Sequence, residues 1–559
     1  MSRGFLQMGR IFPVFLWLVL GLVGLAGCSG PEEKGAGSNQ AAPAAAPAAP
    51  TIPEQGDRLV TGAIGEPSNL ISALSTDASS HEVANLLNVS CLKYDKNLTL
   101  VSHAADFEVL EDGKLLRFTL KPGIRWWDGV ELTARDVEFT YRLMVDPKTP
   151  TAYAENYKHV KEFKVTGAYT FEVRYDEVLA RSLSSWATDI LPRHALEGQD
   201  LLTTRYSREP LGAGPFKLAS WEPGRSLTLV ANPDYFEGRP HLDAIVYRII
   251  PDQSTMFLEL KAGNLDLSDL TPQQYSFQTS GPEWEKNFRK YSYVASAYTY
   301  LGYNLESPLF RDKAVRQALA HAVDKEEIVK GVLLGLGQPA EGPYKPGTWA
   351  YNDKLKPWPY DPAKARAMLA EAGWRDSDGD GVLDRDGKPF AFTILTNQGN
   401  EQRAKAATII QSRLKEVGVA VQIRAVEWAA FIKEFVDKGR FDAVLLGWNT
   451  IPDPDAFDVW HSSQTGPGKL NFIGYRNPEV DEILDKARRS LDMAVRKPLY
   501  DRFQEILQED QPYLFLYTPR ALPVVSARFR GVEPAPAGIG HNLIWWWVPK
   551  AEQRYAQQP

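Results

Sequence analysis

The sequence predicts an α/β protein built from two or three lobes. Its 559 residues exceed what one hydrophobic core usually serves, so more than one lobe is expected. Alternating apolar and polar residues at 116–120 and 171–175 predict short strands in the first half. From about residue 296 to residue 517, predicted helices and strands alternate, which is the pattern of an α/β lobe.

The composition is that of an ordinary globular protein. Hydrophobic residues make up 44% of the chain and charged residues 24%, and the formal net charge is -7. This balance provides no basic field for nucleic acid or for an anionic membrane surface, so no nucleic-acid partner is expected. The 15 tryptophans suit either a core or a ligand cleft with flat apolar walls.

Residues 1–27 are predicted to be a secretory signal peptide. Arg3 and Arg10 flank the start of an apolar run that is too short and too rich in glycine to span a membrane comfortably. Small residues and Cys28 follow, which resembles a bacterial lipobox and implies that Cys28 carries lipid. The alternative is an ordinary signal peptide that happens to contain a cysteine. The lipid would be the only membrane contact, at the periplasmic face or, in a cell with one membrane, at the extracytoplasmic face.

Residues 28–56 are predicted to be a flexible tether. They are rich in alanine, proline and glycine and lack the apolar bulk to pack. If Cys28 carries lipid, Cys91 is the only other cysteine, so no internal disulfide is expected.

The second half is predicted element by element from caps, periodicity and terminal glycines. Local signals give a helix at 362–372 after the N-cap Asp361, a strand from Phe390, a helix at 401–417, a strand at 419–426, a helix at 429–438 and a strand at 441–446. The right-handed crossover rule makes such strands parallel neighbours. Ligands of open α/β sheets bind outside the carboxyl ends of the strands. We therefore expect a cleft at Asn397, Trp428, Gly447, Trp448 and Asn449.

The stretch DSDGDGVLDRDGK at 376–388 partly matches a calcium-binding EF-hand loop. Gly387 replaces the glutamate that normally completes the ligand shell. Two interpretations remain: a solvated Asp-Gly turn, or a structural calcium ion held by Asp376, Asp378, Asp380, the Val382 carbonyl and Asp384, with water or Asp386 in place of the glutamate. The loop enters the amino end of a strand, so either version should lie far from the cleft. No other cofactor is expected.

The chain carries no recognisable catalytic motif. None of its eight histidines has the HExxH spacing, and neither GxSxG nor a Walker A loop occurs. A pair of catalytic carboxylates, as in a glycosidase, stays possible, because the distance between two such groups in the fold cannot be read from the sequence. An enzyme is therefore the less favoured class.

Several motifs resemble the family 5 extracellular solute-binding proteins, which serve ABC importers. They are FTLKPGIRWWDG at 118–129 with its continuation at 132–137, LGAGPF at 211–216, NPDYF at 232–236, VRQALAHAVD at 315–324 and NLIWWW at 542–547. The resemblance runs from about Arg58 to the end of the chain.

The resemblance implies a two-lobe clam-shell of the periplasmic-binding-protein type, in its large three-subdomain form, with mixed sheets and a ligand cleft at the hinge. Lobe 1 would comprise 57–92, 206–290 and 518–559, with an inserted subdomain at 93–205, and lobe 2 would comprise 291–517. The implied partners are a peptide or another small solute and an ABC permease with its ATPase. A monomer without a catalytic centre is expected.

The resemblance also implies site residues. Gly447, Trp448 and Asn449 match the segment that bonds the backbone of a peptide ligand, and Trp428 matches a cleft aromatic. The aspartate that pairs with a peptide amine would fall at Ile451, which has no charge. Asp453 and Asp455 are therefore candidates to replace it, or they only shape an Asp-Pro turn.

Further candidates come from the opposite lobe and the crossover between lobes. They are Ser75, Tyr298, Tyr303 and Asn304. The ligand itself stays open, because relatives take peptides, oligosaccharides, haem, nickel chelates or opines. A surface receptor that uses the same fold without import is a further alternative.

Overall fold

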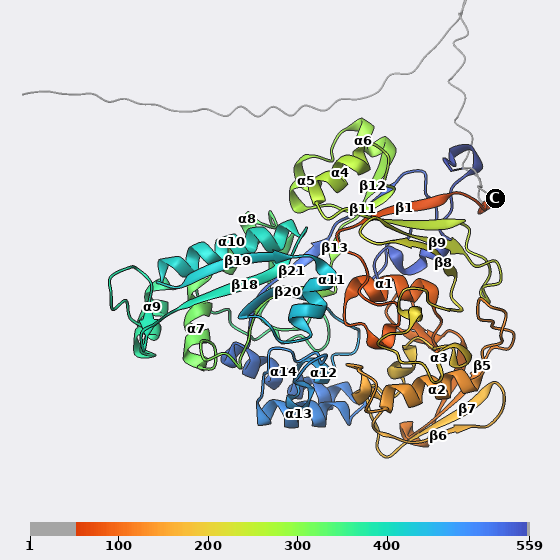
Figure 1. Ribbon diagram of the computed structural model, residues 1–559, viewed down its shortest axis with the longest axis horizontal. Coiled ribbons are helices and arrows are strands. Elements are labelled where there is room, and N and C mark those ends of the chain that lie inside the picture. The colour runs from red at the N-terminus through yellow and green to blue at the C-terminus, as the bar shows by residue number, and fades with distance from the viewer. Residues whose placement is uncertain (1–51, 556–559) are drawn as a thin grey trace, which may run out of the picture. The chain divides into compact units, whose positions relative to one another are not determined.

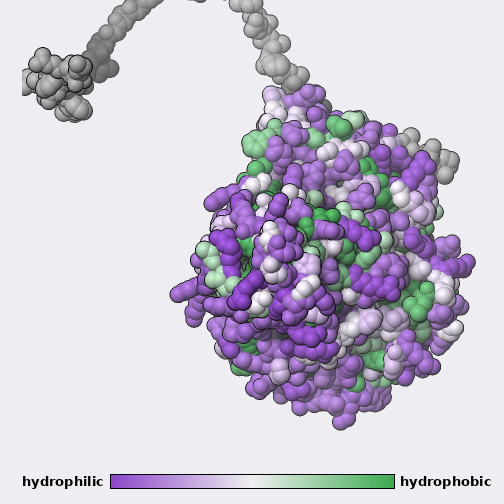
Figure 2. All heavy atoms as spheres, turned by 60° about the vertical axis from the view of Figure 1, so that its left-hand side comes forward, coloured by the Kyte–Doolittle hydropathy of each residue, from purple (hydrophilic) through white to green (hydrophobic). Residues whose placement is uncertain are grey.

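The computed structural model describes residues 52–555. The predicted signal peptide, the predicted lipidation site Cys28 and most of the predicted tether lie outside these residues. No helix within 52–555 is long and apolar enough to cross a membrane. The face shown in Figure 2 is mostly hydrophilic, with small separate apolar patches.

Lobe 1 is organised by a mixed seven-stranded sheet (Figure 1). Its order is β12 (Phe288–Lys290), β22 (Pro523–Ser526), β11 (Leu267–Asp269), β1 (Arg58–Ala63), β10 (Ala244–Ile249), β9 (Ser226–Ala231) and β8 (Phe216–Glu222). Strand β1 is parallel to both neighbours, whereas the remaining pairs are antiparallel. Helices α1 (Ala78–Leu87) and α4 (Gln253–Lys261) belong to this lobe.

The inserted subdomain has its own four-stranded antiparallel sheet. Its order is β4 (Ala105–Leu110), β5 (Leu115–Leu120), β7 (Thr170–Tyr175) and β6 (Val160–Val165), and α2 (Ala134–Val145) packs against β6. The predicted strands at 116–120 and 171–175 are thereby confirmed. In its core, the rings of Phe118 and Phe171 stack 4.9 Å apart. Trp126 of the motif is buried in the same cluster and supports this fold.

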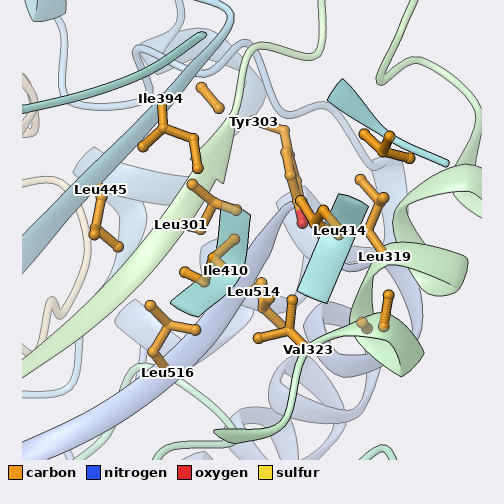
Figure 3. Packing of buried hydrophobic residues seen from close by; sticks show 14 of the residues in the cluster. Leu301, Tyr303, Leu319, Val323, Ile394, Ile410, Leu414, Leu445, Leu514 and Leu516 are labelled. Atoms are coloured by element: carbon orange, nitrogen blue, oxygen red, sulfur yellow. The ribbon is translucent and has the colours of Figure 1, made fainter. Parts of the chain in front are cut away.

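Lobe 2 is organised by a second seven-stranded sheet. Its order is β13 (Tyr293–Val294), β21 (Tyr513–Ala521), β14 (Ala297–Tyr303), β20 (Ala443–Asn449), β18 (Ala391–Asn397) and β19 (Ala420–Val426), with β15 (Gly337–Pro339) beside β21. Helices α7 (Lys313–Ala322), α9 (Pro362–Glu371) and α10 (Glu401–Glu416) pack on this sheet or on one another. Figure 3 shows leucines and isoleucines from several of these elements meeting in one core.

The local predictions for this lobe hold at most elements. Asp361 caps α9 by accepting the Lys364 N–H at 2.9 Å, and Gly418 after α10 has a positive φ of 82°. Strand β18 lies between β19 and β20 and is parallel to both, as the crossover rule predicts. The predicted α/β class with mixed sheets is confirmed.

Two elements differ from their prediction. The helix expected at 429–438 is a short α11 (Trp428–Ala430) followed by a π-helical segment, η6 (Phe431–Val436). The strand expected at 441–446 runs to Asn449, because 447–449 pair with 297–299 of β14. That partner lies far away in sequence, so local patterns do not reveal the extension.

The chain passes between the two sheets at two places. One lies between β12 and β13, at residues 290–293, and the other lies between β21 and β22, at residues 521–523. Strand β21 continues past the predicted boundary at 517, because its last residues pair with β15 and β13. These two short crossovers are the natural hinge positions.

His103, next to the inserted sheet, gives a pH-dependent stability. Its ring nitrogens lie 3.0 Å from the Tyr235 hydroxyl and 3.2 Å from the Ser90 hydroxyl. Burial, aided by the charge of Lys93, lowers the pKa of His103 from 6.5 to about 4. The unfolded chain therefore binds this proton below pH 6.5, whereas the folded chain does so only near pH 4.

We expect the free energy of unfolding to fall by about 2 kcal/mol between about pH 7 and pH 5 because of His103. Urea denaturation at the two pH values measures this loss. In His103→Gln the loss should shrink by that amount, whereas His541→Gln, at a less buried position, should keep the wild-type slope. An unchanged slope in His103→Gln would contradict the assignment.

Candidate functional site

A cavity of about 1300 Å³ lies between lobe 1, lobe 2 and the inserted subdomain. This exceeds the roughly 300–1,000 Å³ of most small-molecule pockets. Its walls come from β1, α1 and β11 on one side, from β14, β20 and α11 on the other, and from the inserted subdomain at one end. A ligand inside it would contact both lobes at once.

The lobes are closed around this cavity. Across the rim, Trp428 Nε1 donates to Asp77 Oδ1 at 3.2 Å, and Lys433 Nζ donates to the Ser68 carbonyl at 2.6 Å. At the inserted subdomain, Arg181 forms an ion pair with Asp458 at 3.2 Å. Such contacts exist only when the lobes meet, so this conformation is the closed one.

The predicted sheet edge lies in the cavity wall. Gly447, Trp448 and Asn449, the last residues of β20, line the cavity, and so does Trp428 at the start of α11. Trp448 Nε1 donates to the Tyr513 hydroxyl at 3.3 Å, which fixes the indole ring. The structure thus brings these four predicted residues together.

Arg403 belongs to the same wall and was missed by the sequence prediction. Its Nη1 donates to Asn397 Oδ1 at 2.7 Å. Asn397 is buried outside the lining and positions this guanidinium, which corrects the prediction that Asn397 contacts the ligand. A Cβ at Gly447 would lie 2.9 Å from the Tyr298 carbonyl oxygen and 2.9 Å from Arg403 Nη2, and the rigid backbone contact explains the glycine there. Burial lowers the pKa of Arg403. The sequence could have indicated Arg403 as a cleft residue, because it lies in the first turn of the predicted helix that follows the carboxyl edge of the sheet.

Asp453 and Asp455 line the cavity, but arginines already hold both carboxylates. Arg496 Nη2 lies 2.8 Å from Asp453 Oδ1, and Arg488 Nη2 lies 2.9 Å from Asp455 Oδ2. Although burial raises the pKa of a carboxyl, the charges of Arg488 and Arg181 hold that of Asp455 below its usual value. This geometry favours the turn-shaping interpretation over the replacement of the missing amine-binding aspartate.

Of the two predicted tyrosines, one lines the cavity and the other does not. Tyr298 lines the cavity, whereas Tyr303 lies in the lobe 2 core with its ring 4.9 Å from that of Phe310. The two tyrosines are an odd number of positions apart on β14, so they face opposite sides of the sheet. The prediction of Tyr303 as a cleft residue is therefore wrong.

Ser75 and Asn304 also lie outside the lining. Ser75 is 1% exposed, and its carbonyl accepts the Tyr153 hydroxyl at 2.9 Å. Asn304 Nδ2 donates to the Phe441 carbonyl at 2.9 Å. Neither residue lines the cavity, which corrects their prediction as contact residues.

Two acidic side chains of the cavity were also missed. Glu82 of α1 and Asp269 of β11 are exposed to the cavity although protein surrounds them. Burial raises the pKa of Glu82 to about 6, and the negative charge of Asp269 adds to this effect. Burial also raises the pKa of Asp269. No local motif marks this pair, because the fold brings the two residues together from distant segments.

The acidic loop lies apart from the cavity, as predicted. Carboxylate oxygens of Asp376, Asp378 and Asp380 lie within 4.8 Å of one another, which suits a shared calcium ion with oxygens at about 2.3–2.6 Å. Asp384 is not in this group, and both of its oxygens accept hydrogen bonds from Ser377. Asp384 and Val382 stay predictions as calcium ligands.

Calcium is expected to stabilise the loop through these three aspartates. With a dissociation constant near 1 mM, about 10 mM calcium would add about 1.4 kcal/mol, which a thermal melt detects. Asp378→Asn should remove the gain, whereas Asp386→Asn, outside the group, should keep it. A melting temperature that calcium leaves unchanged would indicate a plain turn.

Comparisons with known proteins agree with this architecture. The family model of bacterial extracellular solute-binding proteins, family 5, matches residues 101–469. The oligopeptide-binding protein AppA of Bacillus subtilis (strain 168) is 35% identical over 536 residues, which cover 94% of this chain and 96% of AppA.

Two solved structures extend the comparison. The structure of AppA from Bacillus subtilis in complex with a nonapeptide has a TM-score of 0.85 at 35% identity, with 89% of this chain and 100% of AppA covered. The crystal structure of NikZ from Campylobacter jejuni with Ni(L-His) has a TM-score of 0.79 at 28% identity, with 89% and 100% covered. The chain belongs to family 5 of the bacterial extracellular solute-binding proteins.

Proposed function

We propose that this protein is the substrate-binding lipoprotein of an ABC importer. It captures a peptide or peptide-like solute between its two lobes and delivers it to a membrane permease, and the lipid on Cys28 holds it at the cell envelope. The observation that carries the proposal is the closed cavity of about 1300 Å³, whose walls come from both lobes. The similarity to AppA, with its bound nonapeptide, supports a peptide as the ligand.

The walls of the cavity suit an extended peptide. The terminal residues of β20 place polar backbone groups beside the rings of Trp448 and Tyr298, so a ligand would meet hydrogen-bonding groups and flat apolar surface together. Capture by closure requires that the ligand interact with the closed form better than with the open form. Contacts to both lobes provide that difference, and the permease would distinguish the closed, loaded protein.

Native mass spectrometry of the full-length protein, extracted in detergent from its host, tests the proposal. We expect a mature chain that begins at a diacylated Cys28 and that releases peptides on unfolding. A strain without the gene should lose uptake of those peptides, and the wild-type gene should restore it. A co-purified sugar, haem or metal chelate would instead assign a non-peptide solute, and uptake that persists would favour a receptor.

A further inference from the structure

The cavity contains charged side chains that the protein itself does not neutralise. Within residues 52–555, Glu82 and Asp269 form no ion pair, and the groups that influence the pKa of Arg403 include no carboxylate. The two acids come from lobe 1, and the guanidinium comes from lobe 2. Charges of opposite sign thus face the same cavity from opposite walls.

Glu82 has the Tyr247 hydroxyl as a hydrogen-bond partner, and the other carboxylates of the lining also have partners in the described chain. They are Asp77 with Ser68 and Ser80, Asp189 with Asn88, Asp437 with Thr76, Asp453 with Arg496, Asp455 with Arg488, and Asp458 with Arg181. At Ile451 the chain has no charge at all. A cation that entered the cavity would find Glu82 and Asp269 without a competing arginine or lysine.

Charged groups without a partner of opposite charge lower the stability of the folded protein. Both carboxylates are exposed to the cavity, and their negative charges repel each other, which destabilises the state in which both are ionised. Such an arrangement is typical of a functional site, where a ligand supplies the missing charge. Arg403 is an independent example of an uncompensated charge, here a positive one. Its hydrogen-bond partner Asn397 is neutral and does not balance the charge of the guanidinium.

We propose that Glu82 and Asp269 form a subsite for an ammonium or guanidinium group of the ligand, and that Arg403 receives a ligand carboxylate. This inference rests on the proposed function and names the ligand class: a dipolar peptide whose cationic group binds lobe 1. The cation is either the α-amine or a lysine or arginine side chain. Because the two ends bind different lobes, the pairing is complete only when the lobes are closed.

A chymotryptic digest of β-casein, offered to the detergent-solubilised full-length protein, tests the subsite. It contains peptides with and without internal lysine or arginine, and retained peptides are identified by mass spectrometry. A second portion is acetylated, which neutralises α-amines and lysines. We expect the wild type to retain acetylated peptides that lack arginine about tenfold or more less well than their untreated forms, as the loss of a charged hydrogen bond predicts. Enrichment of internal lysine or arginine would identify a side chain as the cation, and its absence would identify the α-amine.

The double variant Glu82→Gln/Asp269→Asn should retain untreated peptides about tenfold or more less well than the wild type. Its melting temperature without ligand should equal or exceed that of the wild type, because the variant removes two unpaired like charges. The matched control, Glu222→Gln/Glu259→Gln, removes the same charge from one exposed and one half-buried ion pair of lobe 1 and should bind as the wild type does.

The outcomes separate the two proposals. If the wild type retains peptides and the Glu82→Gln/Asp269→Asn variant retains the same set equally well, the subsite is overturned and the proposed function stands. For peptides without arginine, equal retention of the acetylated and untreated forms by the wild type would overturn it as well. If the wild type retains no peptide from either portion, the proposed peptide function fails and the subsite fails with it.

Discussion

Arg528→Met is expected to lower the free energy of unfolding by about 3–5 kcal/mol. The guanidinium is 5% exposed, and its Nε and Nη2 donate to both oxygens of Asp266 at 3.0 and 2.8 Å. Arg528 Nη1 also pairs with Asp57. Burial alone would lower the pKa of Arg528, but its hydrogen bonds to Asp266 and the two negative charges raise it. Without the arginine, the buried Asp57 would lose its ion pair, and Asp266 would keep only the longer one with Arg554, at 3.9 Å.

Guanidinium chloride denaturation measures the loss. Arg225→Met, which removes an exposed ion pair with Glu222, should cost less than about 1 kcal/mol and serves as the control. Adding Asp57→Asn and Asp266→Asn to Arg528→Met should recover part of the stability, because the stranded charges disappear. A loss as small as that of the control would contradict the role of this network.

The same network explains why lobe 1 needs three separate segments of the chain. Asp57 lies before β1, Asp266 lies before β11, and Arg528 follows β22. Sequence patterns cannot reveal this connection, because the partners are 471 and 262 residues apart. The division of lobe 1 into three segments was predicted from the resemblance to a known family. Local sequence patterns did not predict it.

Local chemistry predicted most of the α/β half. The N-cap Asp361, the glycine after α10 and the apolar periodicity of α10 act within a few residues, so they can be recognised in the sequence. The extension of β20 to Asn449 depends on β14, more than a hundred residues away, and was not predictable from its own residues. Tyr303 was a different error, since strand periodicity already places it opposite Tyr298.

The part of the candidate site at the sheet edge of lobe 2 was predictable from the sequence, whereas the acidic residues from lobe 1 were not. Trp428 and the end of β20 follow from the rule that ligands bind at the carboxyl ends of parallel strands. Glu82 comes from a helix and Asp269 from a short strand of the other lobe, so only the folded chain brings them to one cavity. Asp453 and Asp455 looked available in the sequence because their arginine partners lie in α13 (Pro478–Arg488) and α14 (Met493–Asp510).

Gly65→Ala is expected to weaken ligand binding by about 5- to 150-fold, which corresponds to the 1–3 kcal/mol of a forced overpacking. Gly65 follows β1 in lobe 1, and a Cβ there would lie 2.5 Å from Cβ and 2.9 Å from Cγ of Trp428 in lobe 2. These Trp428 atoms are next to its backbone, so the side chain cannot rotate away. The φ angle of Gly65 is not positive, so alanine introduces no backbone strain of its own.

The clash exists only when the lobes meet, which distinguishes this variant from a simple loss of stability. Under the proposed function, Gly65→Ala should melt as the wild type does without ligand, because the open form has room for the methyl group. Calorimetry with a peptide that the wild type retains should show the weaker binding, and small-angle X-ray scattering should show a smaller ligand-induced compaction. Gly331→Ala, whose added Cβ would meet only Ile409 at 3.8 Å, is the matched control. Wild-type affinity in Gly65→Ala would mean that binding does not require the closed contact between Gly65 and Trp428, and the closure mechanism would then have to be abandoned.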